Sequence, residues 1–373
     1  MIPAPSEAII HKKIIFPNPK AFLLLLLSFL VFLFACKNTF YSLDDFAAFP
    51  KIDAHVHVNT EKPYFLQQAQ KDRFQLLTLN TEVPYYQPIE EQEKLALSQG
   101  QAFPGQIQYA AAFTMDGWDN PDWQQKTIDM LEKSLANGAV GVKVWKNIGM
   151  SCKNRKGDFI MIDDPQFDAV FEFLVQKNLP VIGHLGEPKN CWLPVEEMTV
   201  ENDKSYFKNH PEFHMYLHPD FPSYEQQISA RDHMLEKHPD LKFIGAHLGS
   251  MEWSVDMIAE HLEKYPNLAV DMTARIGHLQ YQSIDDYDKV RNFFINYQDR
   301  ILYATDLQTQ GDDDPGLLAK QMHETWISDW KYLATAEVMT SALFQGSFKG
   351  LQLPKSVIKK IYRNNVRKWL GIF

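Results

Sequence analysis

The sequence predicts a TIM (β/α)8 barrel, in which eight parallel strands alternate with helices. Eight apolar runs of strand length follow residue 50, and most of them are separated by segments of helix length. The runs are apolar almost throughout, which is typical of parallel strands covered on both faces. Eight such strands are the number that closes a barrel. The runs occupy residues 51–58, 75–79, 107–113, 140–145, 180–184, 242–247, 268–271 and 300–306.

The segments between the runs carry their own signals. Apolar residues at helical spacing predict helices at 121–137, 165–178, 224–238 and 253–265. A doubly wound open sheet is the alternative fold, but it would bring a glycine-rich phosphate loop after the first strand, and none is present. Two connections, 59–106 and 186–223, exceed ordinary loop length, and the first contains strand two. The second is rich in aromatic residues and proline, so we predict a long lid loop after strand five.

Residues 1–36 are predicted to lie outside the barrel domain, which we place at 41–373. Basic residues precede an apolar stretch at 21–35, which has the length of a signal-peptide core and is shorter than a spanning helix usually needs. The stretch ends at Leu33-Phe34-Ala35-Cys36, which looks like a bacterial lipobox with Cys36 as the lipid-bearing residue. The alternative is an uncleaved N-terminal membrane anchor. Either would make the protein exported and membrane-tethered, on the periplasmic or cell-surface side.

Charge and cysteine content limit the partners and the disulfides that the protein can have. The net charge is −10 and no run of five basic residues occurs, which argues against a nucleic-acid partner. Export allows disulfides, and Cys152 and Cys191 follow strands four and five, whose loops are neighbours in a TIM barrel. The sequence leaves open whether these two cysteines form a disulfide or are unrelated thiols.

Histidine or aspartate ends several of the predicted strands. His55 and His57 are two residues apart on the first strand, so their side chains share a face. His184, His247 and Asp306 end the fifth, sixth and eighth runs. One His-x-His pair can arise by chance, but repeated polar strand ends are costly to explain by core packing. These groups suit a divalent metal, and barrel enzymes place their chemistry at this face, so we predict a metal site there.

The same residues carry a family resemblance that extends from about residue 50 to the end of the chain. The sequence resembles the amidohydrolase superfamily, in the amidohydrolase-related branch that includes aminocarboxymuconate-semialdehyde decarboxylase. Ala304 stands where glycine is commoner in the eighth-strand motif, and the aspartate is kept. The matching pieces are Asp53-Ala54-His55-Val56-His57, Gly141-Val142-Lys143, Pro180-Val181-Ile182-Gly183-His184-Leu185-Gly186-Glu187-Pro188, Ala246-His247-Leu248-Gly249, Ala304-Thr305-Asp306 and Ile361-Tyr362-Arg363-Asn364-Asn365-Val366.

The resemblance implies that His55, His57, His184 and Asp306 hold one divalent metal. We expect zinc, with manganese as the alternative. His247 is then either a ligand of a second metal or a catalytic histidine. Some superfamily members carbamylate a lysine on strand four to bridge two metals, and Lys143 is the candidate for that minority case. The alternatives are a lysine packed in the barrel wall for Lys143 and a solvated or substrate-facing loop residue for Lys146.

We predict a metal-dependent hydrolase that acts on a small amide, ester or lactone with metal-activated water. Asp306 would move the water proton to the leaving group, and His247 would orient the substrate or stabilise the developing oxyanion. A metal-dependent decarboxylase on the same site is the alternative function. A third possibility is a catalytically dead binding lipoprotein.

Two further residues are candidates near the metal. Arg275 follows strand seven and can hold a substrate carboxylate bidentately, with a surface salt bridge as the alternative. Glu187 follows His184 by three residues and can accept a ring hydrogen from a metal-binding histidine, with a loop cap as the alternative. Aromatic residues in the same loops can stack on a substrate ring or pack within the lid. They are Trp145, Trp192, Tyr206, Tyr216 and Trp253.

Overall fold

The computed structural model describes residues 39–372, and residues from Phe40 onward form one compact unit. The predicted signal or anchor segment, with Cys36, lies outside the described residues, so that part of the interpretation stays a prediction. Among the helices in the described part of the chain, none combines the length and the apolar character needed to cross a membrane.

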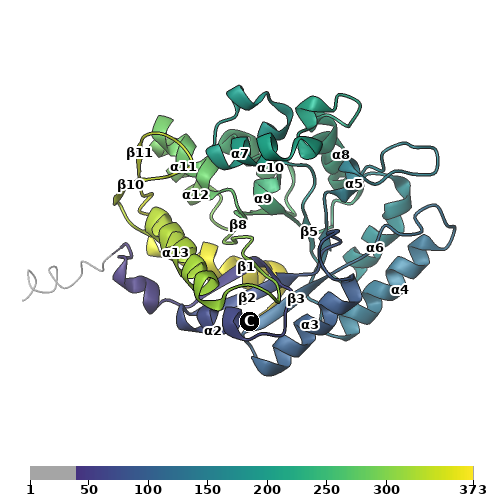
Figure 1. Cartoon of the computed structure of the whole chain (residues 1–373), viewed down its shortest axis with the longest axis horizontal. Helices are drawn as coiled ribbons and strands as arrows, with labels where there is room; N and C mark the ends of the chain where they lie inside the picture. Colours follow the sequence, from purple (N-terminus) through teal and green to yellow (C-terminus); the bar gives the residue numbers. More distant parts are fainter. Residues whose placement is uncertain (1–38, 373) are drawn as a thin grey trace, which may run out of the picture. The chain divides into compact units, whose positions relative to one another are not determined.

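All eight predicted strands are present, and every pairing in their sheet is parallel (Figure 1). A ninth two-residue strand, β9, follows β8 and pairs with β1. The strands are β1 (Lys51–Val58), β2 (Phe74–Leu79), β3 (Ile107–Ala112), β4 (Val142–Val144), β5 (Val181–Gly183), β6 (Phe243–Gly245), β7 (Leu268–Asp271), β8 (Ile301–Leu302) and β9 (Gln308–Thr309).

Backbone hydrogen bonds between β1 and the segment from β8 to β9 close the sheet into a barrel. Ala54 N donates to Tyr303 O at 3.0 Å, and Asp306 N donates to His55 O at 2.9 Å. Further along, β1 pairs with β9 while β8 pairs with β7. The predicted barrel is therefore confirmed, with its last strand broken at the point where Asp306 lies.

Helices follow the strands and cover the outside of the barrel (Figure 1). The four predicted helices are confirmed as α4 (Trp123–Ala136), α6 (Asp168–Gln176), α8 (Tyr224–Lys237) and α10 (Val255–Lys264). The other α-helices of five residues or more are α2 (Tyr64–Lys71), α3 (Ile89–Ala102), α7 (Glu201–Asn209), α11 (Ile276–Asp285), α12 (Tyr287–Asn296), α13 (Pro315–Ala334), α14 (Lys355–Lys359) and α15 (Asn365–Leu370).

The two long connections differ from each other. Residues 59–106 are not a long loop, because α2 and α3 flank β2 there as ordinary barrel helices. Residues 186–223 hold α7 and four short 3-10 helices around a small core of their own. That small core consists of Cys191, Met198, Phe207 and Met215.

Of the two alternatives that the sequence left open for Cys152 and Cys191, the structure favours unrelated thiols, because both cysteines are free. Cys191 is buried in the small core of residues 186–223, where its Sγ donates to Phe213 O at 3.1 Å. Cys152 packs instead against the main hydrophobic core. Neighbouring loops therefore do not bring the two sulfurs together, because each packs into a different core.

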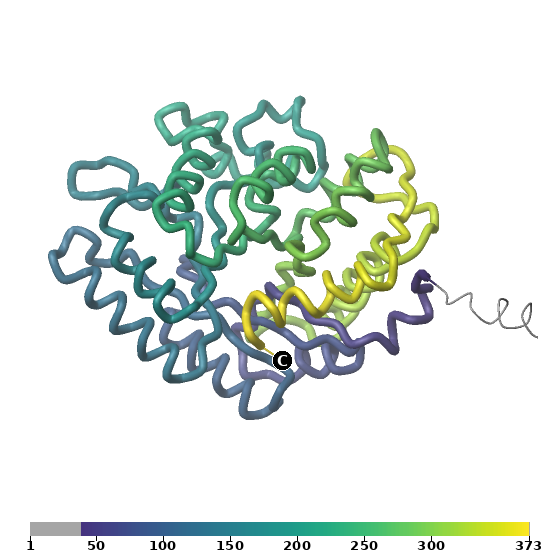
Figure 2. Tube along the Cα trace, turned by 180° about the vertical axis from the view of Figure 1, so that it is seen from behind, coloured from purple at the N-terminus to yellow at the C-terminus, as the bar shows by residue number. Residues whose placement is uncertain are grey.

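Two hydrophobic layers surround the strands. The inner layer consists almost only of strand residues, such as Ile52, Ala54 and Ile244, with the C-terminal Trp369 and Leu370. Helix α15 thus covers the end of the barrel where the strands begin (Figure 2). The larger outer layer lies between strands and helices. The opposite end, where the strands finish, is the face that barrel enzymes use for chemistry.

Candidate metal centre

An irregularity in β1 determines where its two histidines point. The pairing of β1 with β2 shifts register between Asp53 and Val56. Before the shift, Ile52 and Ala54 pack in the inner layer, whereas Val56 after it packs in the outer layer. A regular strand would put these alternate residues on one face. The bulge reverses the alternation and turns His55 and His57 towards the barrel axis.

Three histidine rings are held by their Nδ1 atoms. His55 Nδ1 lies 3.0 Å from Asp271 Oδ2, and His57 Nδ1 lies 2.9 Å from Leu79 O. His247 Nδ1 lies 3.1 Å from Thr273 O. An acceptor at Nδ1 fixes the tautomer that keeps the proton there, so Nε2 carries a free lone pair. In all three rings, Nε2 is therefore the nitrogen that can bind a metal ion.

The strand ends that carry His247 and Asp306 adopt unusual backbone conformations. His247 and Asp306 have φ angles of 57° and 72°, in the left-handed region that residues with a side chain rarely adopt. Gly245 makes the turn at His247 possible, because a Cβ there would lie 2.9 Å from Gly249 Cα. Strain of this kind, held by the surrounding fold, is frequent at functional sites.

Two of the four predicted ligands, His55 and Asp306, lie together with His247 in one group that could hold a metal ion. One ligand atom each from His55, His247 and Asp306 lies within 4.8 Å of the others. Asp306 Oδ1 is also 3.3 Å from His57 Nε2. The ring centres of His184 and His247 are 4.0 Å apart, and His184 Nε2 is buried with no hydrogen-bond partner in the described part of the chain. His184 thus joins the cluster with an open ligand atom.

The charge states of these residues fit a divalent cation. Burial, aided by the charge of Lys143, lowers the pKa of His55 to about 4. Burial also lowers the pKa values of His184 and His247 well below the usual value, so the rings are neutral at pH 7. Burial alone would raise the pKa of Asp306, but the close approach of His57 and the other nearby histidines holds it well below its usual range. Neutral imidazoles and an ionised carboxylate are suitable zinc ligands.

The remaining predicted residues lie around this cluster. Lys143 Nζ is buried 3.2 Å from His55 Nε2, and burial lowers its pKa to about 8. Lys146 forms an ion pair with Glu187. In the described structure, the polar side-chain partner of Glu187 is thus Lys146, and no histidine ring donates to it. Arg275 is buried at the end of the loop after β7.

Sequence reasoning missed Asp271, the last residue of β7. Its Oδ2 lies 3.0 Å from His55 Nδ1, and its Oδ1 accepts from His247 N at 2.9 Å and Thr273 N at 3.1 Å. One carboxylate therefore positions two histidines of the cluster. The sequence held a signal, because Asp271 ends an apolar run as Asp306 does. The sequence did not show that β7 places Asp271 next to His55.

Comparison with known proteins identifies the family. The sequence matches the family described as amidohydrolase over residues 52–372. The chain belongs to the amidohydrolase family. A search of curated proteins finds no significant match.

Several solved structures are similar to this amidohydrolase. A 2,6-dihydroxybenzoate decarboxylase from Rhizobium has 14% identity and a TM-score of 0.49, over 86% of this chain and 98% of that one. A 4-oxalomesaconate hydratase from Rhodopseudomonas palustris has 14% identity and a TM-score of 0.47, over 86% and 95%. A dihydroorotase from Saccharomyces cerevisiae has 10% identity and a TM-score of 0.47, over 87% and 84%. The similarity assigns none of these three activities to this chain.

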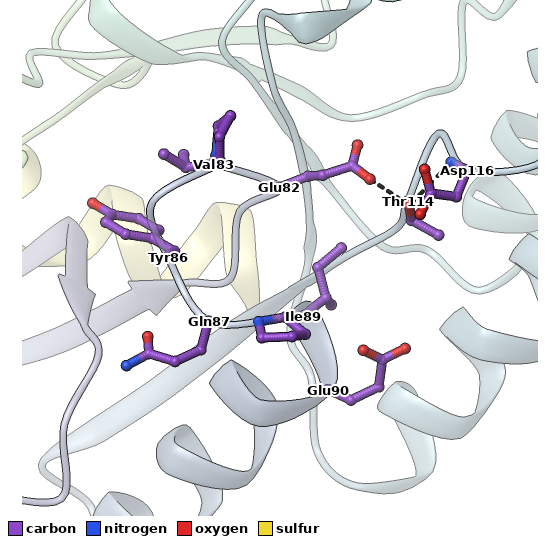
Figure 3. Close-up of a pocket in the computed structure, with 10 residues that line it drawn as sticks. Glu82, Val83, Tyr86, Gln87, Ile89, Glu90, Thr114 and Asp116 are labelled. Atoms are coloured by element: carbon purple, nitrogen blue, oxygen red, sulfur yellow. Dashed lines mark hydrogen bonds between the residues drawn. The ribbon is translucent and has the colours of Figure 1, made fainter.

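Two cavities open beside the histidine cluster of the amidohydrolase. One, of about 560 Å³, is lined by Asp306 together with Ala274, Thr305 and the first turn of α13. The other, of about 350 Å³, lies between residues 82–90 and the loop after β3 (Figure 3). Tyr86 lines this second cavity, and its ring centre is 5.5 Å from that of His57. The larger cavity therefore reaches the cluster at Asp306, and the smaller one adjoins His57 through Tyr86.

Proposed function

We propose that this amidohydrolase is a metal-dependent hydrolase of a small amide, ester or lactone. The position of Asp306 carries the proposal. Its carboxylate lies 3.3 Å from His57 Nε2 and 3.6 Å from His55 Nε2, yet 35% of its side chain is exposed, in the wall of the larger cavity. An ionised carboxylate that reaches both the ligand cluster and solvent is suited to take a proton from attacking water.

We propose His55, His57, His184 and Asp306 as the ligands of one zinc ion, with manganese as the alternative metal. The support is the three inward Nε2 atoms, the open Nε2 of His184 and the adjacent carboxylate. Such an ion, when bound, makes water more acidic and polarises the carbonyl that water attacks. His247 lies within the same cluster, so it can equally serve as a further ligand or contact the substrate.

The chain's own groups then divide the work of hydrolysis. Asp306 accepts the water proton and returns it to the leaving group, which needs it to depart as an amine or alcohol. The Nζ of the buried Lys143 lies 3.2 Å from His55 Nε2, so its charge favours the oxyanion that develops on the substrate. Asp271 keeps the His55 and His247 rings in place during the reaction.

A screen of amides, esters and lactones with zinc and with manganese tests this function. His55→Ala and Asp306→Asn should each abolish hydrolysis and reduce the bound metal measured in the purified protein. His233→Ala is a matched control, because His233 pairs with Asp163 away from the cluster. A fully active His55→Ala enzyme that still carries its metal would disprove the ligand assignment. Release of carbon dioxide from an acid substrate would replace hydrolysis with decarboxylation.

We also propose that the protein is exported and tethered to the membrane through residues 1–36. The support is the apolar stretch and the Leu33-Phe34-Ala35-Cys36 sequence. A Cys36→Ser variant should lose the lipid, detected by mass spectrometry. An unmodified Cys36 in protein that stays in the membrane fraction would favour the anchor helix instead.

A further inference from the structure

Several buried polar atoms lack partners on one side of the site. Within the described residues, these atoms include His184 Nε2, Glu252 Oε2, Thr273 Oγ1 and Arg275 Nε. All four lie on the segments that follow β5, β6 and β7. Buried polar groups are nearly always hydrogen-bonded in folded proteins, so a group of exceptions points to a bound molecule. The unpartnered Nε2 of His184 is explained by its place in the metal cluster. The unpartnered Nε of Arg275 is not explained in this way.

Arg275 is a buried cation without an anion. Its side chain is 8% exposed, yet its one hydrogen bond in the described structure goes from Nη1 to its neighbour's carbonyl, Ala274 O, at 3.1 Å. No carboxylate of the described residues lies within 4.0 Å of the guanidinium. A guanidinium carries five N–H donors, and burying it unpaired costs several kcal/mol, on the order of a lost ion pair. The fold therefore keeps Arg275 in a state that an incoming anion would relieve.

The backbone places Arg275 beside the histidine cluster. Thr273 O, two residues earlier, holds the His247 ring, and Ala274 lines the same cavity as Asp306. Ala274 has a φ of 52°, which turns the chain sharply just before Arg275. The charge of Arg275 also adds to burial in lowering the pKa values of both His184 and His247. The backbone before Arg275 thus adjoins both His247 and the cavity that Asp306 lines.

Two buried carboxylates near Arg275, those of Asp203 and Glu252, have hydrogen-bond donors of their own, although Glu252 Oε2 has none in the described structure. Asp203 Oδ2 accepts from Asn190 Nδ2 at 2.8 Å and lies 3.2 Å from His278 Nε2. Glu252 Oε1 accepts from Lys189 N at 2.9 Å. Both buried carboxylates remain near enough for Arg275 to influence their pKa values. Their charge makes a singly charged carboxylate a better ligand than a phosphate dianion, because like charges repel strongly in a buried site.

We propose that Arg275 binds a carboxylate of the substrate, so that the enzyme acts on small carboxylic acids. The identity of this ligand as the substrate rests on the proposed function, whereas the anion site itself does not. The free Nε edge of a guanidinium offers two parallel N–H groups, which match the two oxygens of a carboxylate. The carboxylate would fix the distance between the reacting carbonyl and Asp306.

Anion binding can be measured without catalysis. Calorimetric titration of the full chain, as purified and after chelation of metal, compares acetate, acetamide and inorganic phosphate as probes. We expect acetate to bind at least about tenfold more tightly than acetamide, as a charge-assisted hydrogen bond predicts. Arg275→Gln should remove this preference, and Arg275→Lys should weaken acetate binding about tenfold because a lysine lacks the planar fork.

Arg300→Gln is the matched control, since Arg300 donates to three backbone carbonyls next to the start of β8. It should leave acetate binding unchanged. Equal acetate affinity in wild type and a folded Arg275→Gln variant would overturn the proposal, as would tighter binding of phosphate than of acetate. Because the titration also runs on chelated protein, it detects an Arg275-dependent anion site even if the enzyme hydrolyses none of the substrates tested. Likewise, hydrolysis can be found in the substrate screen even if Arg275 binds no acetate.

Discussion

The two ends of the barrel treat buried charge differently. Lys51, the first residue of β1, is fully buried, and its Nζ donates to Phe46 O and Phe49 O beneath the rings of Phe46 and Trp330. Arg275, at the opposite end, is also buried but has one carbonyl partner in the described structure. The end where the strands begin satisfies its cation internally, whereas the end where they finish leaves its cation available to a ligand.

The carboxylates on β1 and beside it show the same contrast. Asp53 accepts hydrogen bonds from Thr305 N and Oγ1, from Trp326 Nε1 and from His55 N, which engages both of its oxygens. Asp306 lies next to the rings of His55 and His57 and remains partly exposed. A group that is saturated by its own protein stabilises the fold, and one that is left open can take part in chemistry.

The largest effect is expected from Asp271, which belongs to the open end but has no direct role in chemistry. Asp271→Asn should weaken metal binding by about 10- to 100-fold, because the residue that holds His55 Nδ1 would no longer favour the ligand tautomer. Competition with a chromogenic chelator measures this affinity. Asp168→Asn, which alters a similar carboxylate–histidine pair between α6 and α8, should leave it unchanged. An equal loss in both variants would mean that the effect is general and not due to His55.

Lys51→Met sharpens the comparison from the closed end. The substitution removes the donor to Phe46 O and Phe49 O, so the free energy of unfolding should fall by about 1–3 kcal/mol. Metal affinity should not change, because Lys51 lies at the end of the barrel away from the cluster. Urea denaturation and the same chelator titration provide the two measurements. Weakened metal binding in a stably folded Lys51→Met protein would show that the two ends are not separate in function.

The sequence predicted the strands and the gathering of polar strand ends, because burial and periodicity are local signals. It could not predict the bulge between Asp53 and Val56, since register is decided by pairing with β2 and by packing on both faces. The role of Asp271 depends on where β7 sits relative to β1 across the barrel. The state of Cys191 stayed open for a similar reason, because residues 186–223 build a small core that takes up its side chain.

The smallest effect concerns the pH dependence of stability at the closed end. Burial lowers the pKa of Lys51 to about 7 in the fold, against 10.5 for the unfolded chain. Between these values the unfolded state binds more protons, so stability rises with pH, by at most about 1.4 kcal/mol per pH unit for one group. The neutral amine still has two N–H groups, one for each carbonyl, so deprotonation removes a buried charge without losing a hydrogen bond. Urea midpoints between pH 7 and 9 should therefore rise more steeply in wild type than in Lys51→Met. Parallel pH profiles of the two proteins would show that the aromatic rings and carbonyls keep Lys51 charged throughout this range.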